Sequence, residues 1–379
     1  MSNSKKNILF FTDWFLPAYK AGGPIQSVAN LTNHLKETFN IWVVTSNSDL
    51  DAELVLPPTE LNTWIAKDGY HVIYLNKDHQ NKNTYRSILN EIPVHAIYFN
   101  SLFSLNFTLI PLWLTRNSSI KKVMAPRGML GKGALAIKPT KKKFFLKLFK
   151  AFKLPNKLQW HATDISEKNE IIQHFGKRVK IDVVPNLSAK MTDLVPVKTK
   201  VENSINLFFL SRISVKKNLL SAIKSLEQAT CSINFKIIGP IEEINYWEDC
   251  LKTLNKLPKN IHFEYLGAIP NMQIKDTLRD LHVLLLPTQH ENFGHVIMES
   301  WQNGCPVIIS KNTPWKNLKT EKLGFDLNLE QIDDFTKAIL FFAKMNEKEF
   351  QSWSQASFSF AKKFTENPEL INQSKALFE

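Results

Sequence analysis

The chain has few cysteines and no clear membrane-spanning run, and these two absences exclude several classes of protein. Its 379 residues contain three cysteines, Cys231, Cys250 and Cys305. They show no metal-ligand pairing, so we expect buried thiols in a reducing compartment rather than a disulfide framework or a zinc site. The longest uncharged candidate, residues 96–114, contains Asn, Ser, Thr and Pro, which predict a buried strand, a turn and a helix. A strand pattern starts at once at Asn7 and no small-residue cleavage site follows it, so no signal peptide is expected.

Acidic residues are missing from one long stretch. Residues 92–163 contain no Asp or Glu but hold 13 Lys and Arg. The remaining 35 basic residues equal the 35 acidic residues, so the whole excess of +13 belongs to this stretch. Such an asymmetry indicates an anionic surface or an anionic ligand there.

The centre of this stretch, residues 138–157, is predicted to form a basic amphipathic helix. Its phenylalanines follow helical spacing, and its lysines fall largely on other faces, a pattern typical of helices on anionic membranes. The predicted membrane contacts are Lys141, Lys142, Lys143, Phe145 and Phe149. The alternative is an ordinary helix whose phenylalanines pack on the core. We expect no nucleic-acid partner, because no recognised nucleic-acid module accompanies the charge.

The length exceeds that of one ordinary core, so two domains are expected. Short apolar runs alternate with segments whose apolar residues follow helical spacing, a pattern typical of α/β folds with parallel sheets. The pattern predicts a first domain over residues 1–190, a linker without periodicity over 191–204 and a second domain over 205–360. Residues 361–379 are expected to form a final helix.

Residues 283–310 predict a strand, a polar loop, a helix and a second strand. An apolar run ends at Pro287, a helix begins near Gly294, and Asn303-Gly304 ends it. Glu291 precedes this helix and Glu299 lies on its flank, about 12 Å further along. One ligand could touch both carboxylates, and the first N–H groups of the helix would face an anionic group.

Other loops between strands and helices offer phosphate-binding chemistry. Gly22-Gly23 leaves backbone open to a ligand, although a plain turn is the alternative. Arg212 and Lys217 follow a predicted strand of the second domain, where two cations suit a diphosphate. Asp49-Leu50-Asp51 could hold a divalent metal, but its polar loop context favours no metal, and no cofactor is expected.

Taken together, these residues resemble the retaining GT-B glycosyltransferases of family 4. The matching residues in the second half are Ser211-Arg212, Lys217, Gly239, Leu266-Gly267, Leu286-Pro287, Glu291-x-Phe293-Gly294, Glu299, Gly304-x-Pro306-Val307 and Thr313-Pro314-Trp315. The matches in the first half are Gly22-Gly23, Asn100-Ser101, the run from Ala125 to Leu130, His161-Ala162-Thr163 and Pro185-Asn186. The resemblance covers nearly the whole chain.

This resemblance implies two Rossmann-like domains with parallel sheets facing across a cleft, and a last helix that crosses back to the first domain. It implies catalytic roles for Glu291, Arg212 and Lys217. The implied donor-binding residues are Gly22, Gly23, Arg212, Lys217, Gly239, Gly267, His290, Glu291, Asn292, Phe293, Gly294, His295 and Glu299. On the acceptor side it implies Arg127, Gly128, Met129 and His161, and it leaves open whether Arg127 or His161 serves the acceptor.

The family chemistry implies fixed roles for these side chains. Arg212 and Lys217 would hold the donor diphosphate, Glu299 the ribose and Glu291 the donor sugar. Two departures bear on the donor: Asn218 replaces the usual Gly, and His295 replaces an aliphatic residue.

The resemblance therefore predicts a metal-independent, retaining transferase that builds a surface polysaccharide from a UDP- or GDP-sugar. The acceptor would be a glycan or a polyprenyl-diphosphate-linked sugar, at the inner face of the cell membrane. The alternatives are a nucleotide-sugar epimerase, a phosphorylase, or a non-enzymatic binder of anionic lipid or nucleic acid.

Overall fold

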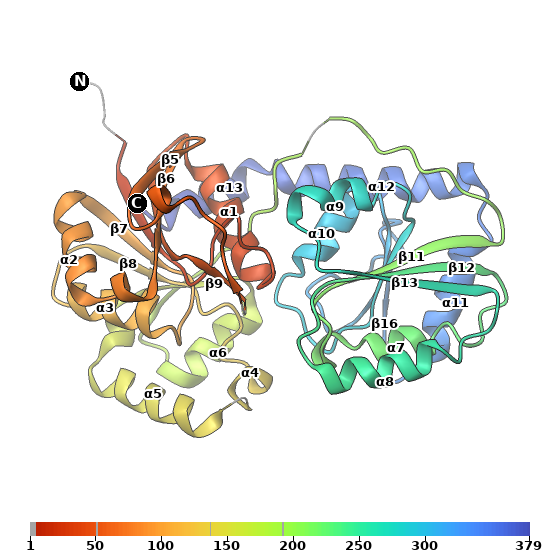
Figure 1. The fold of residues 1–379 in the computed structure, drawn as a ribbon, viewed down its shortest axis with the longest axis horizontal. Helices are drawn as coiled ribbons and strands as arrows, with labels where there is room; N and C mark the ends of the chain where they lie inside the picture. Colours follow the sequence, from red (N-terminus) through yellow and green to blue (C-terminus); the bar gives the residue numbers. More distant parts are fainter. Residues whose placement is uncertain (1–4, 51, 137, 192) are drawn as a thin grey trace. The chain divides into compact units, whose positions relative to one another are not determined.

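The computed structural model describes residues 5–50, 52–136, 138–191 and 193–379. The chain divides into two compact α/β units (Figure 1). Unit 1 comprises Met1–Leu187 and Asn367–Glu379, and unit 2 comprises Ser188–Glu366. The chain therefore returns to unit 1 at its C-terminus.

The described residues of unit 1 form an eight-stranded sheet in the order β10-β9-β8-β7-β1-β2-β6-β5. Its strands are β1 (Asn7–Phe11), β2 (Asn40–Ser46), β5 (Trp64–Lys67), β6 (Tyr70–Leu75), β7 (Val94–Phe99), β8 (Lys121–Met124), β9 (Gln159–Ala162) and β10 (Lys180–Val183). All neighbours pair in parallel except β5 and β6. A short antiparallel pair, β3 (Ser48–Asp49) and β4 (Ala52–Glu53), follows β2.

Helices cover both faces of this sheet because its strands are apolar on both sides. They are α1 (Gly23–Leu35), α2 (Lys82–Glu91), α3 (Ile110–Thr115), α4 (Lys132–Ala136), α5 (Pro139–Ala151), α6 (Ile165–Phe175) and α13 (Pro368–Ala376). Successive residues of β1 face opposite sides. Leu9 and Phe11 join the core with α2, α3, α5 and α6, whereas Phe10 stacks on Phe378, just beyond α13, with ring centroids 5.8 Å apart.

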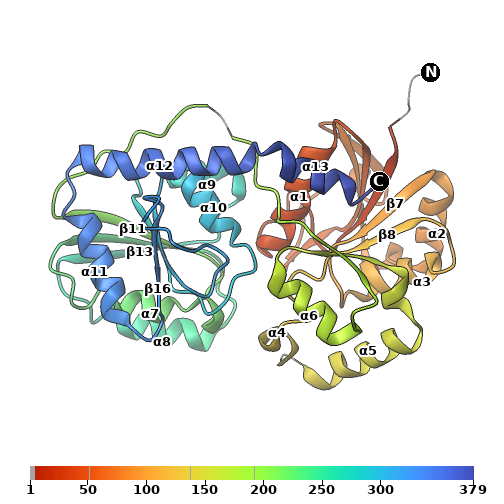
Figure 2. The ribbon, with the colours of Figure 1, turned by 180° about the vertical axis from the view of Figure 1, so that it is seen from behind.

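Unit 2 has a six-stranded parallel sheet in the order β13-β12-β11-β14-β15-β16. Its strands are β11 (Ser204–Leu210), β12 (Ser232–Ile238), β13 (Ile261–Gly267), β14 (Val283–Leu286), β15 (Val307–Ser310) and β16 (Gly324–Leu327). Helices α7 (Leu219–Lys224), α8 (Ile244–Leu254) and α11 (Ile332–Ala343) cover one face. Helices α9 (Asn271–Thr277), α10 (His295–Gln302) and α12 (Glu347–Thr365) cover the other (Figure 2).

Shorter helical segments complete the connections. The 3-10 turns are Pro58–Glu60, Lys77–His79, Leu154–Lys157 and Val215–Lys217, and a π-helical segment, Leu105–Leu109, leads into α3. Both units are Rossmann-like, as the sequence predicts.

The stretch predicted as a linker, 191–204, is attached to unit 2 by two buried lysines. Lys198 is 1% exposed, and its Nζ donates to the carbonyls of Leu278 and Arg279 at 2.6 and 2.9 Å. These carbonyls lie at the C-terminal end of α9, where a cation is favoured. Lys200 likewise donates to Ala343 O, at the end of α11, at 3.0 Å. The described part of this stretch is therefore packed against unit 2. The lack of periodicity in its sequence did not indicate this.

Helix α5 packs on the core through only part of its apolar residues. Leu146 and Phe149 are 7% and 2% exposed. Phe149 therefore lies in the core and does not reach a membrane surface, contrary to the prediction for this residue. Lys142 also turns inward, since its Nζ donates to Ala134 O at 2.6 Å. No described helix is both long and apolar enough to cross a bilayer.

Candidate active site

The predicted donor residues other than Gly22 and Gly23 lie in unit 2, and several of them follow the carboxyl ends of its strands. The strand order reverses between β11 and β14, which leaves a topological switch point there. Open α/β sheets bind their ligands at such points. Arg212 and Lys217 follow β11, and Glu291 follows β14, so the two sides of the switch point supply opposite charges.

Lys217 and Glu291 form an ion pair at this point. Their side chains are 14% and 12% exposed, so the pair is largely shielded from water. Backbone bonds hold both loops: Gln289 N donates to Lys216 O at 2.9 Å, and Glu291 N donates to Asn312 O at 3.0 Å. The lysine ammonium has three N–H donors, so bonding Glu291 leaves others for a further acceptor.

Arg212 pairs with a different carboxylate. Its Nη1 donates to Glu242, which lies in the loop after β12. Both side chains are about one-third exposed, at 33% and 36%. Glu242 is a partner that the sequence reasoning missed, because its position depends on the neighbouring strand rather than on a nearby motif.

The backbone of Asn218 shows why this residue can stand where the family usually has Gly. Its backbone is left-handed, with φ 60° and ψ 44°. Gly enters this region freely, and Asn does so more readily than most other residues. The Asn218 amide donates from Nδ2 to Pro287 O at 2.9 Å and accepts from Ser221 Oγ at 2.9 Å. It therefore connects the loop of Lys217 with the loop of Glu291.

Helix α10 begins where the sequence predicts. Gly294 is its N-cap, with φ 77° and ψ 65°, and no side chain caps the helix. Phe293 is buried, and its carbonyl accepts from Trp315 Nε1. The rings of Phe293 and His295 lie 4.9 Å apart, so His295 extends an aromatic cluster instead of the usual aliphatic contact.

Glu299 lies on α10, partly buried. Desolvation by burial raises its pKa to about 7. No hydrogen-bond donor reaches its carboxylate among the residues that the structure describes. An unpaired, partly buried carboxylate is poised to accept hydrogen bonds from a ligand.

The remaining predicted donor residues differ in surroundings. A Cβ on Gly239 would lie 1.9 Å from Ser211 O, so close strand packing already explains this glycine. Gly267 has φ 71° and open space around it. His290 is exposed, and its Nε2 lies 2.9 Å from Asn292 Oδ1.

In unit 1, Gly22 and Gly23 form the start of α1. Gly22 has φ 69° and ψ −123°, which only glycine adopts without strain, and no atom lies within 4 Å of an ideal Cβ there. The loop before it is held by Asp49, whose carboxylate accepts from Tyr19 N and Lys20 N at 2.8 and 3.0 Å. Asp49 therefore has a structural task, while Asp51 lies outside the described residues.

Arg127 is the centre of a hydrogen-bonded network in unit 1. It is left-handed, with φ 54°. Its Nε donates to Asn100 Oδ1 at 2.9 Å, its Nη2 to Tyr98 Oη at 2.6 Å, and its Nη1 to Asn186 Oδ1. All three partners are neutral. Asn100 also donates to Pro24 O at 3.0 Å, in the first turn of α1, so the arginine and the Gly22-Gly23 loop are coupled.

His161 lies behind this network, buried and bonded at both nitrogens. Its Nε2 donates to Val184 O at 2.8 Å, so its Nδ1 accepts from Tyr98 Oη at 2.9 Å. Burial lowers the pKa of His161 to about 3, with the charge of Arg127 as a second cause. His161 is therefore neutral and positions Tyr98. Arg127 is more exposed than His161.

The predicted Gly128 and Met129 follow Arg127 in the same loop. Gly128 N donates to Glu167 Oε1 at 2.6 Å, and Thr163 N donates to Glu167 Oε2 at 2.7 Å. Ser101 Oγ contacts Met129 Sδ at 3.5 Å. Glu167 is 2% exposed and was missed by the sequence reasoning, since nothing marks it among surface glutamates.

A polar cavity of about 620 Å³ lies at the carboxyl edge of the sheet of unit 1. Its lining follows four adjacent strands, with Asp13 after β1, Ser48 after β2, Gln80 after β6 and Asn106 after β7. Burial raises the pKa of Asp13 above its usual value, and a hydrogen bond from Ser104 offsets only part of this increase in pKa. This cavity was also missed, because its residues share no motif.

Among the described residues, no group of three or more His, Cys, Asp and Glu is placed to hold a metal ion. Metal independence stays a prediction.

With this geometry in place, the comparisons with known proteins become informative. Residues 191–358 match the family model of glycosyl transferases group 1. This match lies within unit 2 and includes every predicted donor residue except Gly22 and Gly23. No curated protein matches the chain in sequence.

Solved structures match almost the whole chain. A sucrose-phosphate synthase from Thermosynechococcus elongatus has a TM-score of 0.74 and 14% identity, covering 99% of this chain and 98% of its own. HepE of Anabaena, in complex with UDP-glucose, has a TM-score of 0.66 and 14% identity, covering 98% of both chains. WaaG, a glycosyltransferase involved in lipopolysaccharide biosynthesis, has a TM-score of 0.63 and 13% identity, again covering 98% of both. These likenesses show the fold: it is GT-B.

Proposed function

We propose that the protein is a retaining glycosyltransferase of family 4 that moves a sugar from a UDP- or GDP-linked donor to a glycan or lipid-linked acceptor. The observation that carries this proposal is the shielded Lys217–Glu291 pair at the switch point, in a segment that matches the group 1 family model. The related fold of HepE in complex with UDP-glucose supports a nucleotide-sugar as donor.

The donor diphosphate binds to the cations of unit 2, Lys217 and Arg212. Lys217 keeps its bond to Glu291 and gives a remaining N–H to a phosphate oxygen, and Arg212 adds further donors. Fixed positive charges favour the departing diphosphate more than the bound donor, because negative charge grows on it as the bond breaks. Glu299 accepts from the ribose, and Glu291 orients the sugar through a hydroxyl.

The transfer step breaks the bond between the anomeric carbon and the diphosphate oxygen. The acceptor oxygen forms the new bond on the same face of the sugar, and the leaving phosphate takes the acceptor's proton. The polar cavity after β1, β2, β6 and β7 is where we place the acceptor sugar. Arg127 orients the acceptor from the network described above.

We further propose that unit 1 rests on the anionic inner face of the cell membrane during surface polysaccharide synthesis. Phe144, Leu148 and Phe152 are 64%, 41% and 53% exposed. Their spacing of four places Phe144 and Leu148 along one side of α5 and Phe152 just beyond its end, and we call these three residues the apolar stripe. Lys141 and Lys143 are exposed near the start of this stripe. An apolar stripe flanked by cations is the chemistry that anionic bilayers bind.

The activity is tested by a thermal-shift screen of UDP- and GDP-sugars, followed by product analysis with the donor that raises the melting temperature. We expect release of nucleoside diphosphate that depends on an acceptor, and a product with the donor's anomeric configuration. Equal turnover in wild type and Glu299→Ala would remove the donor-site assignment. An isomerised donor without acceptor would indicate an epimerase, and a need for inorganic phosphate a phosphorylase.

The membrane contact is tested by sedimentation with vesicles containing phosphatidylglycerol. Phe144→Ser with Leu148→Ser should abolish binding. The matched control is Leu194→Ser with Val197→Ser, which removes two side chains of 81% and 77% exposure from unit 2. Equal binding by both double variants would contradict the role of α5.

A further inference from the structure

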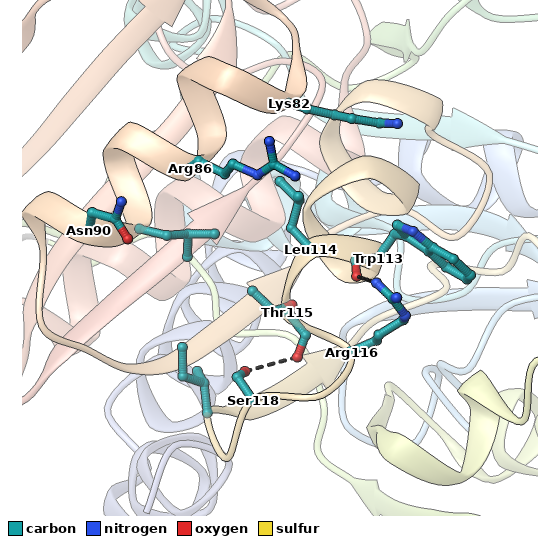
Figure 3. A pocket seen from close by; sticks show the side chains of 10 residues that line it. Lys82, Arg86, Asn90, Trp113, Leu114, Thr115, Arg116 and Ser118 are labelled. Atoms are coloured by element: carbon teal, nitrogen blue, oxygen red, sulfur yellow. Dashed lines mark hydrogen bonds between the residues drawn. The ribbon is translucent and has the colours of Figure 1, made fainter.

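A second cavity of unit 1, lined by basic residues, lies between α2 and α3 (Figure 3), and the function proposed above does not use it. Its volume is about 500 Å³. Residues 118 and 120, which lead into β8, form one of its ends. The cavity therefore reaches the amino edge of the sheet, opposite to the carboxyl edge where the sugar substrates are placed.

Three cations line this cavity, and no acidic residue does. Lys82 and Arg86 are one turn apart on α2, so they share a face of the helix. In the described part of the chain, neither side chain has a hydrogen-bond or ion-pair partner. Arg116 completes the set from the end of α3, where its Nη1 donates to Trp113 O at 2.6 Å.

An aromatic wall closes one side of the cavity. The guanidinium of Arg116 lies 4.0 Å from the centroid of the Trp113 ring. Stacking on the indole fixes the plane of the arginine while leaving N–H groups for an anion. Leu89, Leu114 and Ile120 add apolar surface. A ligand here would combine a compact anionic group with an apolar part.

The cavity is continuous with the exposed stripe of α5. Trp113 is 37% exposed and meets Phe152 edge to face, with ring centroids 5.2 Å apart. Phe152 is the last member of the stripe. Lys157 Nζ donates to Arg116 O at 3.1 Å. This bond joins the turn after Phe152 to the end of α3.

We propose that this cavity binds the phosphate headgroup of an anionic phospholipid, with the acyl chains running past Trp113 toward Phe152. Indole rings favour the membrane interface, and arginine binds phosphate through paired N–H groups. The inference rests on the proposed membrane contact and adds a specific headgroup site to it. A soluble phosphate compound would use the same cations but would have no use for the adjoining apolar stripe.

The test uses the full chain, with vesicles of phosphatidylcholine that contain either phosphatidylglycerol or oleate at equal surface charge. Arg86→Gln with Arg116→Gln is the cavity variant. Lys177→Gln with Arg178→Gln is the matched control, since it removes two exposed cations from another part of unit 1. Thermal melting checks that each variant is folded.

Wild type and the control variant should bind the phosphatidylglycerol vesicles about tenfold more tightly than the oleate vesicles, and the cavity variant should lose this preference. Brominated phosphatidylglycerol should quench wild type more than Trp113→Phe. Equal preference in the cavity variant and wild type would overturn the site, as would full displacement from vesicles by millimolar inorganic phosphate. If wild type binds no vesicles at all, the membrane contact itself fails, while nucleoside diphosphate release by the cavity variant reports separately on the transferase.

Discussion

The carboxyl edges of the two sheets hold their cations in opposite ways. In unit 2, Lys217 and Arg212 each pair with a carboxylate, Glu291 and Glu242. In unit 1, Arg127 bonds to two amide oxygens and a phenol oxygen. A carboxylate neutralises a cation, whereas neutral dipoles orient it and leave its charge available. We infer that a bound diphosphate shares the cations of unit 2 with their carboxylate partners, whereas unit 1 presents a fixed positive charge.

The largest effect is expected at the shielded pair of unit 2. Lys217→Ala should lower acceptor-dependent turnover about 10²- to 10³-fold, because a charge on the leaving group is lost. Steady-state release of nucleoside diphosphate measures this. Lys216→Ala is the control: this neighbouring lysine is exposed and forms no ion pair among the described residues, so the variant should retain activity.

Variants of the Lys217–Glu291 pair can distinguish its contribution to stability from its contribution to catalysis. Lys217→Ala leaves Glu291 shielded without its cation, which should cost about 3 kcal/mol of unfolding free energy. Adding Glu291→Gln should restore much of that stability without restoring activity. A double variant that regains turnover would show that the pair acts only as a structural bridge.

The fixed charge of unit 1 is probed by Arg127→Lys. One ammonium cannot reach Tyr98, Asn100 and Asn186 together, so the positive charge stays but its position is lost. We expect transfer to the acceptor to fall about 10²-fold through misplacement, with donor binding measured by thermal shift almost unchanged. Arg178→Lys, an exposed matched change, should have no effect. A loss of donor binding would instead assign Arg127 to the donor phosphates.

A smaller effect is expected from the pH response of Glu299. Its pKa is raised to about 7 in the folded chain from a usual 4.5. The native state thus binds the proton more tightly than the unfolded state, so this group's contribution to stability falls as pH rises from about 4.5 to 7. In the folded protein the carboxylate that accepts from ribose forms around this pKa of about 7, so donor affinity should rise about tenfold between pH 6 and 8.

Glu299→Gln checks this assignment. It should flatten the pH dependence of donor affinity and raise the stability of the ligand-free protein at pH 8. The measurement uses a nucleotide-sugar rather than a free nucleoside diphosphate, whose terminal phosphate titrates in the same range. An unchanged pH profile in Glu299→Gln would assign the titration to another group.

These contrasts also mark how far the sequence predicts the structure. Both Rossmann-like units, the start of α10 at His295 and strands such as β14 follow from local apolar patterns and glycine signals. Glu242, Glu167 and Tyr98 do not, because each acts on a residue that only the sheet order brings near. The faces of α5 are the intermediate case. Helical spacing predicts the helix, but the contacts of Phe149 and Lys142 depend on how it packs.

The smallest expected effect concerns Asn218, which joins the two loops of the unit 2 site. Asn218→Gly keeps the left-handed backbone but loses the bonds to Pro287 and Ser221, which should cost about 1 kcal/mol. Asn218→Ala loses the same bonds and adds about 1 kcal/mol of left-handed strain. Turnover should change less than about threefold in the glycine variant, because Lys217 and Glu291 still hold each other. If it falls much further, the Asn218 bridge sets the geometry of the Lys217–Glu291 pair, and a neutral amide then positions the cation of unit 2, as Asn100 and Asn186 position Arg127 in unit 1.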